Sequence, residues 1–281
     1  MQSNYRYQYE PRKKYLCPNC GHKSMKRFID TSTNTLLSDD FGVCERLFNC
    51  GYEKRPHTEK IEREPIYQVP KIPFYFPNEI MEKTLNRNST NVLFNFLCKN
   101  FSQERVSATF NSYKVGTTDW GDTIFWQVNQ VGWIVAGKKI QYFSDGHRNK
   151  ARGASWLHNS NGFDLGTHEL CQTLFGTHLI NTSTSKIYVV ESEKTALICD
   201  IVKKDKNTLF LATGGLQNLG LISKIKTNAP IFCISDNDGN EIWKQKIEKL
   251  GLNCKIEIIP ALQKMKLGSD VSDLILMLNS R

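Results

Sequence analysis

Acidic residues follow two apolar runs in the last third of the chain, at points where buried strands are expected to end. Glu191 comes directly after KIYVV, and Asp236 and Asp238 come just after IFCIS. Two carboxylates one residue apart repel each other and raise each other's pKa unless a positive charge lies between them. Carboxylate oxygens are ligands that Mg²⁺ and Mn²⁺ prefer. The pattern therefore indicates a divalent-metal site, and the alternative is a simple turn, for which Asp-Asn-Asp-Gly is also well suited.

Two further acids, Asp270 and Asp273, lie in the segment GSDVSD near the C-terminal end of the sequence. Either carboxylate could extend the metal site. An acid in the first turn of a helix is also favoured by the helix macrodipole, without any metal. The residue types alone leave both interpretations open.

Four of the nine cysteines lie in two close pairs near the N-terminal end, in CPNCGHK at 17–23 and CERLFNCGY at 44–52. Two such pairs about two dozen residues apart are typical of a structural zinc site. We therefore predict four zinc ligands: Cys17, Cys20, Cys44 and Cys50. The second pair is separated by five residues rather than two, which leaves open whether His22 or His57 replaces Cys44.

The composition favours a polyanionic partner. The 281 residues include 37 Lys and Arg against 28 Asp and Glu, a formal net charge of +9. Such an excess suits nucleic acid before a membrane surface, and the alternative is a merely basic soluble protein. The sequence contains no apolar run of the roughly 18 residues that a membrane-spanning helix needs and no signal-peptide pattern. We therefore expect a cytoplasmic protein whose cysteines serve as metal ligands or buried thiols.

The elements expected to position the acids alternate regularly from residue 186 onward. We predict strands at 186–192, 207–215, 229–238 and 254–261, and helices at 193–204, 216–225, 241–252 and 270–279. Alternation with continuous apolar strands predicts an α/β fold with a mostly parallel sheet covered on both faces. Ligands of such sheets bind beyond the carboxyl ends of the strands, so Glu191, Asp236 and Asp238 are expected at one edge.

The middle of the chain has a different pattern, typical of an α+β subdomain. Apolar spacing predicts helices at 78–85 and 89–101, and alternation predicts strands at 112–117, 122–130 and 132–143, the last two as a hairpin. The proline-rich stretch before it resists helix formation and is expected to be an extended linker. The predicted domains are therefore a zinc ribbon at 1–60, a linker at 61–77, an α+β subdomain at 78–184 and the parallel-sheet domain at 185–281.

The order of the acids resembles the Toprim domain, the catalytic domain shared by bacterial-type primases, topoisomerases and some nucleases. The resemblance covers residues 185–281 and implies that Glu191, Asp236 and Asp238 hold Mg²⁺ or Mn²⁺. Asp270 resembles the later catalytic acid of primases, where a similar Gly-x-Asp run precedes the final helix, and is preferred to Asp273. The chain departs from primases after the first strand, with ESEKTA in place of Glu-Gly-Tyr-Met-Asp. This leaves open whether Glu193 and Lys194 belong to the site or are solvated.

A zinc ribbon ahead of a Toprim domain resembles the layout of bacterial and phage DNA primases. The segments DTIFWQVNQVGWIVAGKKIQYF and LCQTLFGTHLI are similar to primase segments that precede the Toprim domain. The chain also resembles a group of small primase-like proteins of mobile elements and phages, which share the RFID and IFWQ phrases. The resemblance implies contact with nucleic acid through four basic residues: Lys138, Lys139, Lys150 and Arg152. Their alternative is the lysine-rich end of a hairpin.

The resemblance as a whole implies a DNA primase-type nucleotidyltransferase acting in DNA replication. Such an enzyme binds single-stranded DNA and synthesises short primers from NTPs or dNTPs with Mg²⁺ or Mn²⁺, and its zinc is structural. Two alternatives remain, a Toprim-class metal-dependent nuclease and a non-catalytic DNA-binding accessory protein. The sequence contains no Gly-x₄-Gly-Lys-Ser/Thr loop, so unwinding is expected from a separate helicase or replication initiator.

Overall fold

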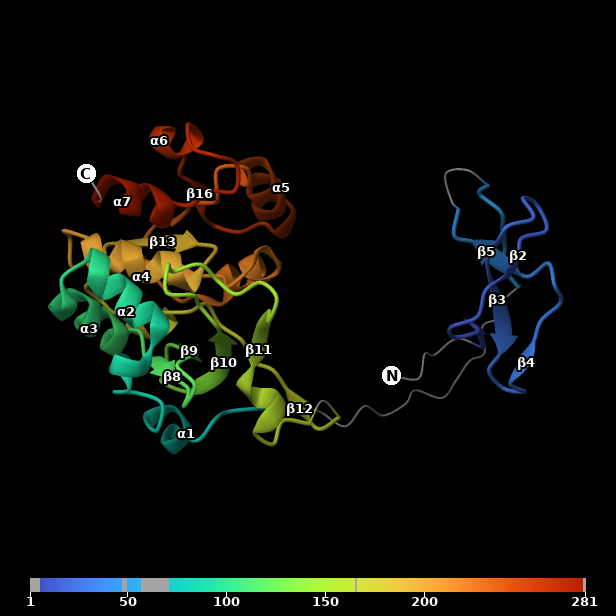
Figure 1. Cartoon of the computed structure of the whole chain (residues 1–281), viewed down its shortest axis with the longest axis horizontal. Coiled ribbons are helices and arrows are strands. Elements are labelled where there is room, and N and C mark those ends of the chain that lie inside the picture. Colours follow the sequence, from blue (N-terminus) through green and yellow to red (C-terminus); the bar gives the residue numbers. More distant parts are fainter. Residues whose placement is uncertain (1–5, 47–49, 57–70, 165, 280–281) are drawn as a thin grey trace. The chain divides into compact units, whose positions relative to one another are not determined.

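The computed structural model describes residues 6–46, 50–56, 71–164 and 166–279. Its internal contacts divide the chain into two compact units, Met1–Gln68 and Val69–Arg281 (Figure 1). Most of the predicted linker lies outside the described residues. Its last part is packed on the second unit, because Phe74 and Phe76 are buried and the Phe76 N–H donates to the carbonyl of Ile134 at 2.8 Å.

The first unit is a small antiparallel sheet built around one long strand. The strands are β1 (Tyr7–Tyr9), β2 (Tyr15–Leu16), β3 (Lys23–Asp30), β4 (Thr35–Leu36), β5 (Gly42–Cys44) and β6 (Glu53–Lys54). They follow the order β1-β3-β5-β6, and β2 and β4 also pair with β3. Along β3 the buried side chains Met25, Phe28 and Asp30 are separated by exposed or half-buried ones. Cys17, Cys20 and Cys50 lie outside the strands, and Cys44 is the last residue of β5.

The first sheet of the second unit is also antiparallel, in the order β11-β10-β9-β8. Its strands are β8 (Val115–Thr117), β9 (Thr123–Val128), β10 (Ile134–Ile140) and β11 (Ala154–Trp156). The predicted hairpin forms from β9 and β10, and its turn is closed by the Gly132 N–H donating to the Asn129 carbonyl at 3.0 Å. The helices that precede it are α1 (Asn78–Glu82), the 3₁₀ helix η1 (Asn88–Thr90), α2 (Val92–Asn100) and α3 (Gln103–Ser112).

The second sheet of this unit is parallel, in the order β14-β13-β15-β16. Its strands are β13 (Lys186–Val190), β14 (Thr208–Ala212), β15 (Ile231–Cys233) and β16 (Lys255–Ile256). The connecting helices are α4 (Glu193–Val202), η4 (Leu216–Lys224), α5 (Asn240–Leu250), α6 (Pro260–Gln263) and α7 (Val271–Asn279). The predicted α/β class is confirmed as a mixture of parallel and antiparallel sheets.

Some elements differ from the sequence predictions in extent or type. Helix α3 was not predicted, although Val106, Thr109 and Phe110 are spaced to form its buried face. The expected strand at 254–261 is limited to β16, because Pro260 occupies the first position of α6, where its fixed φ favours a helix. The short helix predicted at 216–225 is the 3₁₀ helix Leu216–Lys224.

The remaining elements of the second unit are a two-stranded sheet and two 3₁₀ helices. These are β7 (Ile72–Pro73), which pairs in parallel with β12 (His168–Glu169), and the 3₁₀ helices η2 (Leu157–Ser160) and η3 (Thr177–Leu179). Phe175 exchanges backbone hydrogen bonds with Ala212 at the edge of β14. No helix in the described part of the chain combines the length and apolar character needed to cross a lipid bilayer.

One hydrophobic core of the second unit contains residues from both sides of the predicted boundary at residue 185. It contains Phe110 and Phe125 from the α+β part together with Ile187, Leu197 and Leu211 from the parallel-sheet part. Helix α4 lies at the centre of this arrangement and contacts both α3 and α7 (Figure 1). Helix α3 therefore packs on α4, and Thr109 on α3 contacts Asp200 on α4 across 91 positions of the sequence.

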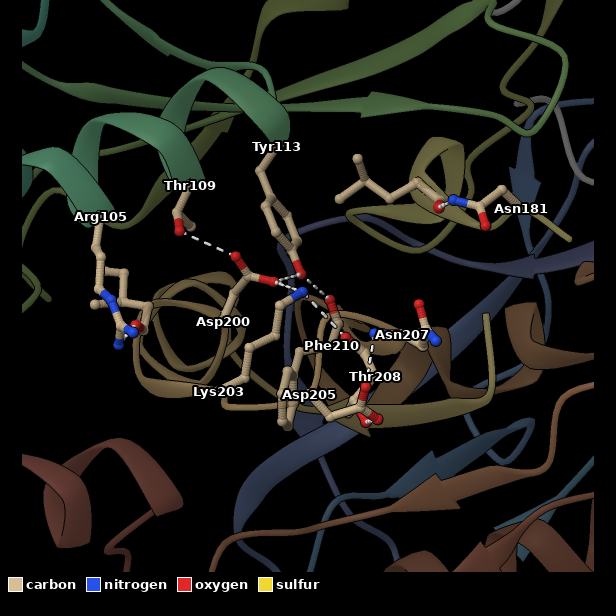
Figure 2. A network of polar contacts seen from close by, with 12 residues as sticks. Arg105, Thr109, Tyr113, Asn181, Asp200, Lys203, Asp205, Asn207, Thr208 and Phe210 are labelled. Atoms are coloured by element: carbon tan, nitrogen blue, oxygen red, sulfur yellow. Dashed lines mark hydrogen bonds and ion pairs between the residues drawn. The ribbon is translucent and has the colours of Figure 1, made fainter. Parts of the chain in front are cut away.

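A polar network reinforces the same junction. Figure 2 shows Thr109 and Tyr113, from α3 and its C-terminal end, directed toward Asp200 on α4. Asp200 accepts hydrogen bonds from Thr109 at 3.0 Å and Tyr113 at 3.3 Å, and it pairs with Lys203 at 2.6 Å. The Tyr113 hydroxyl, which is fully buried, also donates to the carbonyl of Phe210 on β14 at 2.7 Å.

Replacing Tyr113 with phenylalanine is expected to lower the free energy of unfolding by about 1–2 kcal/mol, because the buried O–H, whose one hydrogen serves two partly buried acceptors, is lost without any change of ring shape. Urea denaturation followed by circular dichroism measures this change. Tyr188→Phe is the matched control, since its ring stacks on Phe210 and its hydroxyl has no hydrogen-bond partner among the described residues. Equal effects of the two substitutions would contradict the role given to the Tyr113 hydroxyl.

Candidate functional site

The four predicted cysteines meet in the first unit. Cys17 follows β2, Cys44 ends β5, and Cys20 and Cys50 lie in the two turns. All four sulfur atoms lie within 4.8 Å of one another, with Cys17 and Cys50 at 3.6 Å and Cys20 and Cys44 at 4.0 Å. Tetrahedral zinc with Zn–S bonds of about 2.3 Å would place the sulfur atoms about 3.8 Å apart. The four cysteines therefore form a site that fits zinc.

The alternatives to Cys44 are not part of this group. The His22 ring contacts the carbonyl oxygen of Cys20 at 2.8 Å, and His57 lies outside the described residues. The Asn19 side chain and the Tyr52 N–H donate to the Cys50 sulfur and lower the pKa of that thiol to about 6. Burial raises the pKa of Cys17 to about 11. A bound zinc ion would offset this second effect, because thiolates are its ligands.

The predicted acids meet at the carboxyl edge of the parallel sheet. Strands β13 and β15 are neighbours at the middle of this sheet, so Glu191 and Asp236, which follow them, lie at the same edge. Asp238 is exposed in the turn before α5, and Asp270 immediately precedes α7. The topology of the sheet is what brings residues 45 positions apart together.

The carboxylates of this edge repel one another. Burial raises the pKa of Asp236 to about 7, helped by Asp270, Glu191, Asp238 and Asp273 in that order. Burial also raises the pKa of Glu191, while a hydrogen bond from the Trp243 side chain and the charge of Lys138 oppose it. None of these five acids forms an ion pair with any other described residue. The edge therefore holds negative charge that a divalent cation would neutralise.

The carboxylates are too far apart to form a complete set of metal ligands by themselves. Within the described ranges, the four cysteines are the only group of three or more His, Cys, Asp or Glu residues whose ligand atoms lie within 4.8 Å of one another. Mg²⁺ retains several waters and is usually bound through one or two carboxylates together with substrate phosphates. The open acidic edge fits this mode of binding, with Glu191 and Asp236 as the central residues.

Asp270 and Asp273 form a reciprocal cap at the start of α7. Asp270 accepts hydrogen bonds from the Asp273 N–H at 3.0 Å and from Ser272 at 2.6 Å, and its N–H donates to the Asp273 carboxylate at 3.1 Å. The Thr195 hydroxyl of α4 donates to the other Asp270 oxygen. Such a capping box fixes the start of a helix. The negative charges of both acids raise the pKa of Asp236, and Asp270 has the larger effect.

Asn237, between Asp236 and Asp238, has a role that the sequence analysis missed. Its amide donates to the carbonyls of Met265 at 3.0 Å and Lys266 at 2.8 Å, and its oxygen accepts from the Gly268 N–H at 2.9 Å. These bonds fasten the loop that carries Asp270 to the end of β15. An asparagine between two acids in a turn is the signal that could have suggested a loop-fixing role.

Replacing Asn237 with alanine is expected to weaken cation binding at the acidic edge by 10- to 100-fold, because outer residues that orient ligands typically have effects of that size. Titration of the zinc-loaded chain with Mn²⁺ measures the affinity. Asn228→Ala is the matched control, since this exposed asparagine lies at the other end of the sheet, before β15. An unchanged affinity in the Asn237 variant would show that the loop holds its position without this side chain.

The four predicted basic residues divide into two groups. Lys138 is buried and its ammonium contacts Glu193 and the Gly214 carbonyl. Lys139 is half-buried, Lys150 and Arg152 are exposed, and none of these three forms an ion pair within the described residues. Nucleic-acid contact by the four residues stays a prediction, and for Lys138 it would require breaking the buried pair with Glu193. The exposed pair has the free charge that a phosphate would require.

Comparison with known proteins places these observations in a wider context. A family model described as Domain of unknown function (DUF6371) matches residues 91–236, and a zinc beta-ribbon finger model matches residues 3–65. No curated protein matches the sequence.

Several solved structures are similar at low identity. The primase fragment of the bacteriophage T7 primase-helicase is 16% identical with a TM-score of 0.43, over 98% of this chain and 97% of that one. The Mycobacterium tuberculosis primase RNA polymerase domain is 14% identical with a TM-score of 0.36, over 60% and 58%. The zinc-binding and RNA polymerase domains of the Aquifex aeolicus primase give 14% and 0.38, over 63% and 43%. The chain spans about half the length of these two bacterial structures.

The two family models correspond to different parts of the fold. The zinc ribbon model covers the described strands of the first unit and all four clustered cysteines. The other model extends from the residue before α2 to Asp236, and so includes Glu191 and the antiparallel sheet. With more than half of its residues matched by that model, the chain belongs to the DUF6371 family and carries a zinc ribbon domain ahead of it.

Proposed function

We propose that the chain is a primase-like nucleotidyltransferase that binds single-stranded DNA and joins nucleoside triphosphates into short primers. The observation that carries the proposal is the acidic edge, where neither Glu191 nor Asp236 forms an ion pair with any described residue and the pKa of Asp236 rises to about 7. A protein gains no stability from crowded carboxylates, so a site of this kind indicates a function. The sequence resemblance to Toprim domains supplies the reaction class.

In this proposal residues 185–281 act as a Toprim domain, preceded by a primase-like subdomain at 78–184. A Mg²⁺ or Mn²⁺ pair would lower the pKa of the attacking 3′-hydroxyl and offset charge on the departing pyrophosphate. Glu191, Asp236 and Asp238 would hold the ions, and Asp270 would keep the acidic loop in place through its cap. Lys139, Lys150 and Arg152 would contact DNA phosphates. A separate helicase or replication initiator would supply unwound template.

The zinc ribbon supports the choice of a nucleic-acid substrate. A pocket of about 1010 Å³ lies on it, and most of its lining side chains are basic: Arg12, Lys13, Lys14, Tyr15, Leu16, Lys23, Arg27 and Asp39. The Arg27 guanidinium lies 4.9 Å from the Tyr15 ring centroid, and Leu16 is exposed beside it. Cations together with aromatic and apolar side chains suit a single strand, whose phosphates and bases both need partners.

The test uses the purified zinc-loaded chain with Mg²⁺ or Mn²⁺, mixed-sequence single-stranded DNA and labelled NTPs or dNTPs. A parallel reaction contains end-labelled DNA. We expect short new products, reduced at least about a hundredfold in the Asp236→Ala/Asp238→Ala variant, because even outer residues of metal sites have effects of 10- to 100-fold. Glu248→Ala is the matched control, as this acid is exposed on α5 and lies outside the acidic edge.

Other results would redirect the assignment. Shortened end-labelled DNA without new products would show a metal-dependent nuclease that uses the same acids. Bound DNA with neither reaction would show an accessory protein, and the proposal of an enzyme would then be wrong.

A further inference from the structure

A buried ion pair lies beside the acidic edge, between the antiparallel sheet and the first turn of α4. Lys138 on β10 and Glu193 at the start of α4 have side chains that are only 7% and 4% exposed. The Lys138 Nζ lies 2.9 and 3.2 Å from the two Glu193 oxygens and 2.8 Å from the carbonyl oxygen of Gly214. An ammonium has three N–H donors, and all three are therefore used.

Glu191 is a second carboxylate within electrostatic range of this ammonium. It precedes Glu193 by two residues, and the charge of Lys138 acts on it to lower its pKa. Nevertheless Lys138 directs its hydrogen bonds to Glu193 and Gly214, and the structure contains no ion pair between Lys138 and Glu191, both of which are described. The choice of Glu193 rather than Glu191 as the partner of Lys138 matters, because a carboxylate paired with a buried ammonium would have to break that pair before it could bind a metal ion.

The turn at Thr213 and Gly214 contacts both Lys138 and the backbone of Glu191, and so helps to keep the ammonium paired with Glu193. The Gly214 N–H donates to the backbone carbonyl of Glu191 at 2.8 Å, while the Gly214 carbonyl accepts from Lys138. A Cβ atom at Gly214 would lie 2.6 Å from a Glu193 oxygen and 3.1 Å from the Lys138 Nζ, and the φ of +68° also favours glycine. The glycine thus lets the turn approach the ion pair and the Glu191 backbone at once.

We propose that Glu193 is a positioning residue that holds the Lys138 ammonium away from Glu191 and so leaves Glu191 free to bind a divalent cation. The inference rests on the proposed function, in which Glu191 is a metal ligand. Without the Glu193 charge, the buried ammonium would turn to Glu191 as its counter-charge and compete with the metal. The residue at this position is therefore expected to control metal affinity without touching the metal.

The test is a comparison of Mn²⁺ affinity in four forms of the zinc-loaded chain, measured by calorimetric titration with the metal alone. Glu193→Gln keeps the shape and removes the counter-charge, and it is expected to weaken Mn²⁺ binding at least tenfold. Lys138→Met removes the competing ammonium, and its affinity for Mn²⁺ is expected to lie within threefold of that of the original chain. The double variant, Lys138→Met with Glu193→Gln, is expected to recover to the same level.

The recovery separates positioning from a general structural role. If the pair served only to stabilise the fold, all three variants would lose affinity together and the double variant would be no better than Glu193→Gln, which would overturn the inference. Unchanged affinity in Glu193→Gln would overturn it as well. Circular dichroism checks the fold. Should Glu193→Gln not fold, Lys138→Met and the double variant are compared with the original chain, and a tenfold loss of Mn²⁺ affinity in the double variant would overturn the inference.

The same titration gives a different outcome if the proposed function itself is wrong. If the unmodified chain and Asp236→Ala bind Mn²⁺ equally weakly, the acidic edge is not a metal site. That outcome rejects the proposed function before any Glu193 variant is compared, and it rejects the inference with it.

Discussion

Replacing Asp236 with asparagine is expected to stabilise the folded chain while removing its ability to bind a cation at the acidic edge. Burial and four neighbouring carboxylates raise the pKa of Asp236 from 3.8 to about 7. A rise of that size corresponds to about 4 kcal/mol against the ionised form. Because Asp236 is partly exposed, solvent screening reduces this figure, and we expect a gain of about 2 kcal/mol in the free energy of unfolding.

The gain should depend on pH in a defined direction. Between pH 3.8 and about 7 the folded chain binds a proton at Asp236 that the unfolded chain has released. Stability linked to this residue therefore falls as the pH rises through this interval and is constant above it. The difference between Asp236→Asn and the original chain should be largest above pH 7 and should vanish toward pH 4.

Thermal unfolding at pH 5 and pH 8, with and without Mn²⁺, measures both effects. The original chain should gain stability from Mn²⁺ at pH 8, whereas Asp236→Asn should start from a higher midpoint and gain nothing. Glu248→Gln is the control for net charge, because it removes one exposed acid on α5, away from the acidic edge. A lower midpoint for Asp236→Asn than for this control at pH 8 would contradict the repulsion described for the acidic edge.

The convergence of the acids could be predicted because it depends on a general property of parallel sheets. Glu191 and Asp236 each follow an apolar run, and parallel neighbours place their carboxyl ends at one edge. The zinc site could be predicted for a similar reason, since the spacing of Cys17 and Cys20 is set by local turn geometry. In both cases the information lies within a few residues of each acid or cysteine.

The supporting contacts could not be predicted, because their partners are distant in the sequence. Lys138 and Glu193 are 55 positions apart, and nothing local distinguishes this lysine from the adjacent Lys139. Asn237 contacts residues about 28 positions later, through backbone carbonyls that any sequence would supply. Tyr113 meets Phe210 across 97 positions. Such pairs are determined by how the elements pack, so the residues that orient the site become visible only in the folded chain.

Removing zinc is expected to unfold the first unit and leave the second unit folded. Among the described residues, the hydrophobic cluster of the first unit has seven members, of which four are the cysteines themselves, with Met25, Tyr15 and Tyr52 as the others. A core of this size does not stabilise a small domain by itself, and structural zinc typically supplies the missing folding free energy. The second unit has a separate core and contains no member of the cysteine cluster.

Cys20→Ser tests this expectation with a matched control, Cys171→Ser, which changes a partly buried cysteine of the second unit. Cys20→Ser should reduce the zinc content to nearly zero and abolish hydrogen-exchange protection along β3 and β5, with protection of β13 and α4 unchanged. Cys171→Ser should retain zinc and protection in both units. Full zinc content in Cys20→Ser would remove Cys20 from the ligand set. Loss of protection throughout the second unit would show that its stability depends on the ribbon, contrary to the independence of the two cores.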